Sequence, residues 1–156
     1  MKPITIMNEM LKELAPDLTK EFPRSPRVVL GGYVVAARTL DKCRAVLAGT
    51  AGEYHFDCPL DRTFLDFAGI SGEDFREFVA TGANDAEVAK WIGENSQVRS
   101  DEERVAWNNR MRSTRPCDMP IELQMFLEGY IPEFVGTKRP VYVWFDVYDI
   151  EEGRLS

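Results

Sequence analysis

The residues most able to do chemistry gather between Pro23 and Asp61, where charged side chains, tandem glycines and the single histidine occur close together. Cationic side chains there could hold a phosphate or a carboxylate through charge-assisted hydrogen bonds, and the glycines could let a ligand approach the backbone. The sequence therefore predicts a binding site for a small anionic ligand. Its candidate residues are Arg24, Arg27, Gly31, Gly32, Arg38, Asp41, Lys42 and His55.

A second candidate chemistry is nucleophilic catalysis by Cys58. Pro59 suits the first position of a helix, so Cys58 would lie just before a helix N-terminus. His55 could then act as the base, with Asp57 to orient it. Against this, an extended segment would direct His55 and Cys58 to opposite sides, and free cysteines usually serve as small buried hydrophobes.

The third interpretation makes the charged residues architectural, with arginines tying the proline-containing segment 17–27 to helix carbonyls and acidic side chains. The polar side of the helix around Arg38 would then be a solvated surface with an Arg38–Asp41 pair. The chain would be a binding or interaction module that contacts another protein or a second subunit through an aromatic patch. The residues expected in this patch are Trp91, Trp107 and Trp144.

Composition limits the partners. A chain of 156 residues is about one domain, and 44% hydrophobic with 29% charged residues is the ordinary globular range. The net charge of −7 argues against nucleic acid, because phosphate binding needs a basic surface. No apolar run reaches the roughly 18 residues of a membrane span, and no leader is recognisable.

The number and spacing of the cysteines and the single histidine argue against further classes of protein. The three cysteines lack C-x-x-C spacing, which argues against a disulfide framework and favours a reducing cytoplasm. One histidine with dispersed cysteines does not form a zinc site. Phosphate-loop, dinucleotide and nucleophile-elbow motifs are missing, so we expect neither a metal nor a cofactor.

Helix signals along the chain predict an all-α fold, a single compact orthogonal bundle of about six or seven helices spanning residues 1–156. Apolar residues from Met7 to Leu14 follow helical spacing, and Pro59 and Gly69 bracket a short helix. The clearest helix starts pair a capping side chain with an acidic residue three positions later. These pairs are Ser71 with Asp74, Asn84 with Glu87, and Ser100 with Glu103.

Two segments allow extended structure, 53–58 and 141–147. The segment 141–148 has the propensity of a strand and the spacing of a helix. A lone strand would lack hydrogen-bond partners, so we favour a helix there. We expect a helix from 118 to stop at Gly129 and Pro132, and residues 149–156 to form a frayed tail.

Several short motifs in residues 17–92 occur in an order that resembles a bacterial family, domain of unknown function 5069. The motifs are D-L-T-x-x-x-P-R-S-P-R, L-G-G-Y, L-D-K-C-R-A, G-E-Y-H, C-P-L-D and F-A-G-I. The family pattern often has Leu-Pro before the arginine matching Arg38, where this chain has Ala36-Ala37. The resemblance implies no particular activity, substrate or cofactor.

Overall fold

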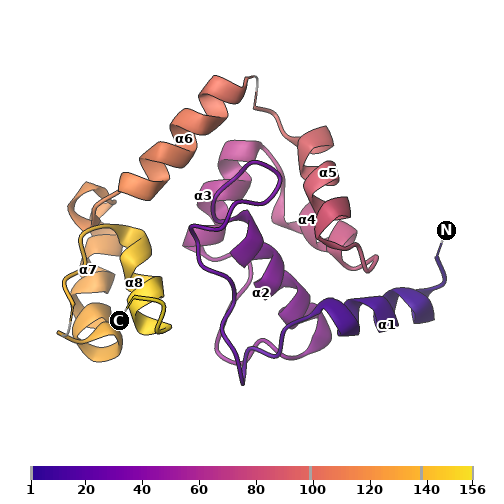
Figure 1. Ribbon diagram of the computed structural model, residues 1–156, viewed down its shortest axis with the longest axis horizontal. Coiled ribbons are helices and arrows are strands. Elements are labelled where there is room, and N and C mark those ends of the chain that lie inside the picture. The colour runs from indigo at the N-terminus through magenta and orange to yellow at the C-terminus, as the bar shows by residue number, and fades with distance from the viewer. Residues whose placement is uncertain (1, 99, 138, 156) are drawn as a thin grey trace. The chain divides into compact units, whose positions relative to one another are not determined.

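The computed structural model describes residues 2–98, 100–137 and 139–155, and its regular structure is helical (Figure 1). These residues form eight α-helices, a short 3-10 helix and a π-helix, with no strand among them. The chain is therefore all-α, as predicted, with one or two more α-helices than we expected.

The helices divide between two compact units, and the single domain expected for 1–156 stays a prediction. Unit 1, residues 1–104, contains α1 (Ile4–Leu14), α2 (Ala36–Ala48), α3 (Pro59–Ala68), α4 (Gly72–Val79) and α5 (Asp85–Asn95). Helix α6 (Asp101–Ser113) begins in unit 1. Unit 2, residues 105–156, contains the rest of α6 and then η1 (Pro116–Asp118), α7 (Ile121–Tyr130), η2 (Ile131–Val135) and α8 (Trp144–Glu151).

Helix α2 is the centre of unit 1. It contacts α1, α3 and α4, and Figure 1 shows these helices arranged around it. Every side chain from Ala36 to Ala45 is buried, so both the apolar and the polar sides of α2 face protein. The expectation that the polar side of α2 is a solvated surface is therefore wrong. A helix covered on several sides keeps its charged side chains from water, and they need partners inside the protein.

The predicted boundaries of α3 and the predicted starts of α4 and α5 are confirmed. Cys58 is the N-cap of α3, Pro59 opens the helix, and Gly69 ends it with a left-handed φ of 73°. The Ser71 side chain caps α4, and Asn84 with Glu87 forms a complete capping box at the start of α5. Short-range hydrogen bonding explains why these boundaries can be read from sequence.

The extended segment allowed at 53–58 is not formed. The Tyr54 N–H donates to Ala51 O at 3.0 Å, which closes a turn. Asp57 has a positive φ of 64°, and its N–H donates to Asp61 Oδ2 at 2.9 Å. The carboxylate of Asp61 therefore bends the chain into α3, an interaction that strand alternation does not include.

The last apolar segment becomes helix α8, as we favoured, and the extended alternative for 141–147 is wrong for its second half. The N–H groups of Tyr142 and Val143 each donate to Asp146 Oδ2 at 3.0 Å, so Asp146 starts the helix from within its first turn. A local carboxylate acceptor outweighs the strand propensity of the valines and aromatics.

The chain after 149 is more ordered than the frayed tail that we expected. Helix α8 continues to Glu151, and Glu152 is buried. The Arg154 guanidinium donates to Asp149 Oδ1 at 2.6 Å and also to the Glu152 carboxylate. This charge cluster satisfies the end of the helix and holds the following residues against it.

Pro132 does not end the preceding helix where we expected. The backbone continues from α7 into the π-helix η2, which ends at Gly136, and the Gly136 N–H donates to Ile131 O at 2.9 Å. This i to i+5 bond is the π-helical pattern. Pro132 lies where the α-helical hydrogen bonding of α7 gives way to the π-helix η2.

None of the helices in the described part of the chain has both the length and the apolar character needed to cross a membrane.

Candidate functional site

The charged residues predicted as a ligand site belong to a buried network around α2. Arg38, Lys42 and Arg44 are 2%, 3% and 3% exposed. Burial of an ionised side chain is unfavourable unless an opposite charge or several hydrogen bonds accompany it. The partners of these three cations therefore decide what the network can do.

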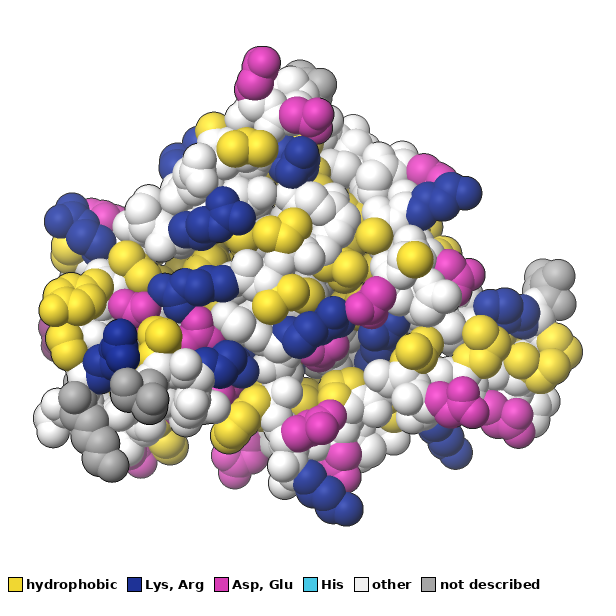
Figure 2. Space-filling view, in the orientation of Figure 1, with side chains coloured by type: hydrophobic (Ala, Val, Ile, Leu, Met, Phe, Trp, Pro, Cys, Tyr) yellow, Lys and Arg dark blue, Asp and Glu magenta, His cyan; other side chains and the backbone are white. Residues whose placement is uncertain are grey.

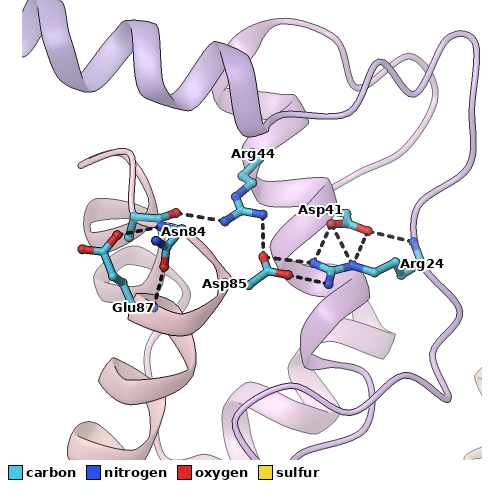
Figure 3. Close-up of polar contacts among 7 residues, drawn as sticks. Arg24, Asp41, Arg44, Asn84, Asp85 and Glu87 are labelled. Atoms are coloured by element: carbon cyan, nitrogen blue, oxygen red, sulfur yellow. Dashed lines mark hydrogen bonds and ion pairs between the residues drawn. The ribbon is translucent and has the colours of Figure 1, made fainter.

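Arg24 and Asp41 form the first pair, as Figure 3 shows. The backbone N–H of Arg24 donates to Asp41 Oδ2 at 2.8 Å, and its Nη2 donates to Oδ1 at 2.9 Å. Arg24 Nε adds a contact to Oδ2 at 3.0 Å. Since three donors of one residue converge on one carboxylate, Asp41 fixes the segment before α2 onto the helix.

Asp85 links two arginines from different segments (Figure 3). Its Oδ2 accepts from Arg24 Nη1 at 2.8 Å, and its Oδ1 accepts from Arg44 Nη1 at 2.9 Å. Arg44 Nη2 also donates to Ala83 O at 2.9 Å. The capping box of Asn84 and Glu87 places Asp85 at the first position of α5. The network therefore joins the chain before α2, α2 itself and the start of α5.

The arginines control the protonation of Asp85. Burial alone raises the pKa of a carboxyl group, but hydrogen bonds and charge from Arg24 and Arg44 outweigh it and hold the Asp85 pKa below its ordinary value. Two guanidinium groups and two carboxylates balance in charge across Arg24, Asp41, Arg44 and Asp85. A small anion would have to displace a carboxylate to reach these guanidinium edges.

Lys42 lies in a second cluster, against the start of α3. Its Nζ is 2.9 Å from Asp61 Oδ1 and 3.1 Å from Cys58 Sγ. Asp61 is fully buried and also accepts from Thr39 Oγ1 at 2.8 Å. Asp61 thus holds α2 and α3 together, and the Cys58 thiol contacts Lys42.

The other predicted residues lie in different surroundings. Arg38 Nη1 donates to Arg24 O at 3.3 Å, and its guanidinium lies over the Tyr54 ring, 5.6 Å from the centroid. His55 is exposed on the loop between α2 and α3. The Arg27 N–H donates to Ser25 Oγ at 3.1 Å within the preceding turn. The structure thus brings Arg24, Arg38 and Asp41 together and leaves His55 at the surface.

Gly31 and Gly32 have positive φ angles of 61° and 89° and let other parts of unit 1 approach the backbone. A Cβ on Gly31 would lie 3.3 Å from Ile92, and one on Gly32 would lie 2.9 Å from Arg104 Nη1. Arg104 donates to Gly32 O at 2.7 Å. These glycines therefore serve close packing within unit 1.

A surface hollow of about 490 Å³ adjoins the glycines. Arg104 lies on its wall, where it also donates to Asp101 Oδ1 at 3.0 Å. The Tyr33 and Ser96 hydroxyls form a hydrogen bond beside it. The lining residues are Gly31, Gly32, Tyr33, Gly93, Ser96, Val98, Ser100, Asp101 and Arg104.

The expected tryptophan patch is not at the surface. Trp107 and Trp144 are buried, and Trp91 is half-buried, with its ring stacked on Phe78 at a centroid distance of 5.1 Å. Large side chains with this much apolar area are needed for the cores of small compact units. The prediction of an aromatic surface patch built from the tryptophans is therefore wrong.

Exposed apolar side chains instead gather on α7 and η2 of unit 2. We name the α7 face by its members, Ile121, Met125, Phe126 and Phe134, which are 60%, 65%, 59% and 52% exposed. In Figure 2, hydrophobic side chains are visible over α7. The sequence predicted a helix from 118 but not that these side chains are exposed. The available signal was that apolar residues are spread around this helix and not confined to one stripe, so packing on one side cannot bury them all.

The α7 hollow lies beside this face and has a volume of about 400 Å³. Its floor and walls are mainly apolar, with one carboxylate and one amide among them. The lining residues are Pro116, Cys117, Gln124, Leu127, Glu128, Ile131 and Pro132. An apolar hollow beside exposed apolar side chains is a common form of protein-recognition surface.

Within the described residues, no three His, Cys, Asp or Glu side chains come together as metal ligands. Fold and site together define a small all-α protein with a buried charged helix in one unit and an exposed apolar helix in the other. The chain belongs to the family described as domain of unknown function DUF5069, which it matches over residues 20–154. A comparison with curated proteins found no match.

Proposed function

We propose that this protein is a binding module that recognises another protein through the α7 face and the adjoining α7 hollow. The observation that supports this most directly is the exposure of Ile121, Met125, Phe126 and Phe134, each more than half exposed within a short segment. Fully burying one such side chain is worth roughly 1.5–3 kcal/mol. A partner that covers this face therefore gains much of its binding free energy there.

The charged network of unit 1 supports a non-enzymatic role. Arg24, Arg44 and Lys42 are engaged by Asp41, Asp85 and Asp61. These ion pairs give the charged residues between Pro23 and Asp61 a structural role. The three free cysteines suit a reducing compartment, and we place the module in the bacterial cytoplasm.

Site-specific crosslinking in cells tests this function. A photo-crosslinking amino acid at Ile121 should give one discrete adduct with another protein, and Met125→Ser in the same chain should abolish it. Val29→Ser is the matched control, since Val29 is an exposed apolar residue of unit 1, and it should leave the adduct unchanged. Absence of an adduct, or equal loss in both variants, would contradict the proposal.

Binding of a small anion is the second candidate, favoured by the Arg104 guanidinium on the wall of the hollow beside Gly31 and Gly32. Phosphate or sulfate should then raise the melting temperature, because a ligand of the native state stabilises it. Arg104→Gln should remove the increase and Arg112→Gln should keep it. Loss in Arg38→Ala instead would place the anion at α2, and equal responses in all variants would exclude a specific site.

A further inference from the structure

The charged residues of the segment that carries the α7 face are all of one sign. Residues 121–135 contain the three glutamates Glu122, Glu128 and Glu133 and neither lysine nor arginine. All three are exposed, and none makes an ion pair within the described part of the chain. Arg115, on the turn leading to η1, is held by Asp118 at 3.0 Å, so it does not neutralise them. The helical segment of the α7 face therefore supplies only acidic charges, and we call Glu122, Glu128 and Glu133 its acidic rim.

The α7 hollow is suited to an apolar side chain from outside. Leu127 and Ile131 are among its apolar lining residues, and Glu128 supplies the carboxylate of its lining. Met125 is a helical neighbour of Glu128, because residues three apart lie side by side on a helix. Glu128 therefore joins the hollow, which it lines, to the side of the α7 face that carries Met125. A volume of about 400 Å³ lies within the range of sites that enclose small organic groups.

We infer that the partner presents a basic amphipathic helix to this surface, an inference that rests on the proposed binding function. An apolar residue of that helix enters the α7 hollow, and its lysines or arginines lie opposite Glu122, Glu128 and Glu133. Helices with apolar anchors at spacings of three and four residues commonly bind in such grooves. Opposite charge at the rim adds association rate and specificity to the affinity of the apolar contact.

Charge complementarity favours this occupant over two others. A second copy of the chain would bring the same acidic rim against itself, since a two-fold interface places one surface patch on its own copy. Like charges in such a contact are unfavourable. An anionic membrane surface attracts basic segments, and the acidic rim would be repelled from it.

Fluorescence anisotropy with two synthetic peptides of about 18 residues, five turns of helix, tests the inference. Both carry the same leucine face; one has lysines on its polar side and the other has glutamates. The lysine peptide should bind at least about tenfold more tightly. The triple variant Glu122→Gln, Glu128→Gln, Glu133→Gln should weaken its binding roughly tenfold, and raising the salt concentration should weaken it in the wild type.

The matched control removes three exposed glutamates of unit 1 with the variant Glu9→Gln, Glu13→Gln, Glu77→Gln. It changes the net charge equally and should leave the dissociation constant within about twofold. An equal loss in both triple variants would mean unspecific attraction to an acidic protein and would overturn the inference.

The failures of the two proposals are distinguishable. Equal binding of both peptides, abolished by Met125→Ser, would overturn the basic partner and keep the apolar docking surface. Failure of the lysine peptide to bind, with the Ile121 crosslink still formed in cells, would also overturn only the partner's chemistry. Loss of the peptide binding and of the crosslink together would overturn both proposals.

Discussion

At the scale of single residues, the charged side chains of α2 pair with charged residues from other segments of unit 1. Lys42 and Asp61 are a buried pair whose members hold two helices together, since Lys42 belongs to α2 and Asp61 to α3. Arg24 and Arg44 share Asp85, which belongs to α5. Residue types that suggest a ligand site thus connect helices, because Arg24, Lys42 and Arg44 each find a carboxylate within the chain.

Removing one member of the buried pair should be costly. Asp61→Ala leaves the Lys42 ammonium without its carboxylate in a fully buried site, which should lower the free energy of unfolding by about 3–5 kcal/mol. Urea denaturation measures this change. The double variant Lys42→Met, Asp61→Leu should lose less, because no charge stays buried; a larger loss in the double variant would contradict the account.

The arginines of the network should make stability depend on pH in the acid range. The Asp85 pKa is lower in the folded protein than its ordinary value of 3.8. Its contribution is therefore complete above about pH 4 and disappears as the pH falls through the folded pKa. Because the carboxyl is 47% exposed, the effect should be below about 1 kcal/mol.

Asp85→Asn should accordingly lose less unfolding free energy between pH 5 and pH 3 than the wild type loses. Denaturant titrations at these two pH values give the comparison. Asp66→Asn, an exposed aspartate of α3, should keep the wild-type dependence. The same dependence in Asp85→Asn as in the wild type would remove Asp85 from the account of acid stability.

The cysteines should differ widely in reactivity. Burial raises the pKa of the Cys43 thiol to about 12, so little thiolate forms at pH 8. Iodoacetamide, followed by peptide mass mapping, should modify the exposed Cys117 first and Cys43 last. Since the Cys58 thiol contacts Lys42, His55→Ala should not change the alkylation rate of Cys58. Slower alkylation of Cys58 in that variant would instead support a Cys58–His55 catalytic pair.

At the scale of elements, backbone geometry fixes the approach of neighbouring segments to α2. Gly32 has a left-handed φ, and Arg104 leaves no room for a side chain there. Gly49, at the end of α2, has a similar φ of 76° with open space around it. Substitution of Gly49 therefore measures the cost of the left-handed conformation alone, and substitution of Gly32 adds the cost of close packing.

Gly49→Ala should lower the free energy of unfolding by about 1 kcal/mol, the cost of a left-handed conformation for a residue with a Cβ. Gly32→Ala should cost more, because the added methyl meets the Arg104 guanidinium. Thermal or urea denaturation of both variants measures the difference. Equal losses would mean that Arg104 moves aside without cost.

Features that depend on residues close in sequence were predictable, and features that depend on contacts between helices were not. The caps at Ser71, Asn84 and Ser100 were predictable, because a side chain within three residues satisfies each helix start. The burial of the polar side of α2 was not, since it depends on Asp61 and Asp85, which lie on other helices. One signal for Asp85 was available in the sequence. Asp85 directly follows the helix cap Asn84, so its position at the start of a helix could be predicted.

The candidate sites show the same division. The sequence identified Arg24, Arg38, Asp41 and Lys42 as unusual, but their spacing does not reveal whether a ligand or another part of the chain neutralises them. His55 was grouped with them by proximity in sequence and lies at the surface. The α7 face was missed because apolar residues at helical spacing predict a core, and exposure is known only once the helices are packed.

At the scale of the whole molecule, the two units carry different kinds of surface. Unit 1 keeps most of its unusual chemistry inside, around α2. Unit 2 exposes large apolar side chains on α7 and η2 with glutamates beside them. The network of α2 is therefore architectural, and the α7 face is the surface for which we propose recognition.

Nuclear magnetic resonance of the 15N-labelled full chain, titrated with the lysine-rich amphipathic peptide, tests this assignment most directly. The account predicts that amide shift changes concentrate in residues 116–135, which contain the α7 face and the α7 hollow, and that they disappear in the Met125→Ser variant. The largest changes at Gly31, Gly32 and the start of α2, or no changes at all, would contradict it.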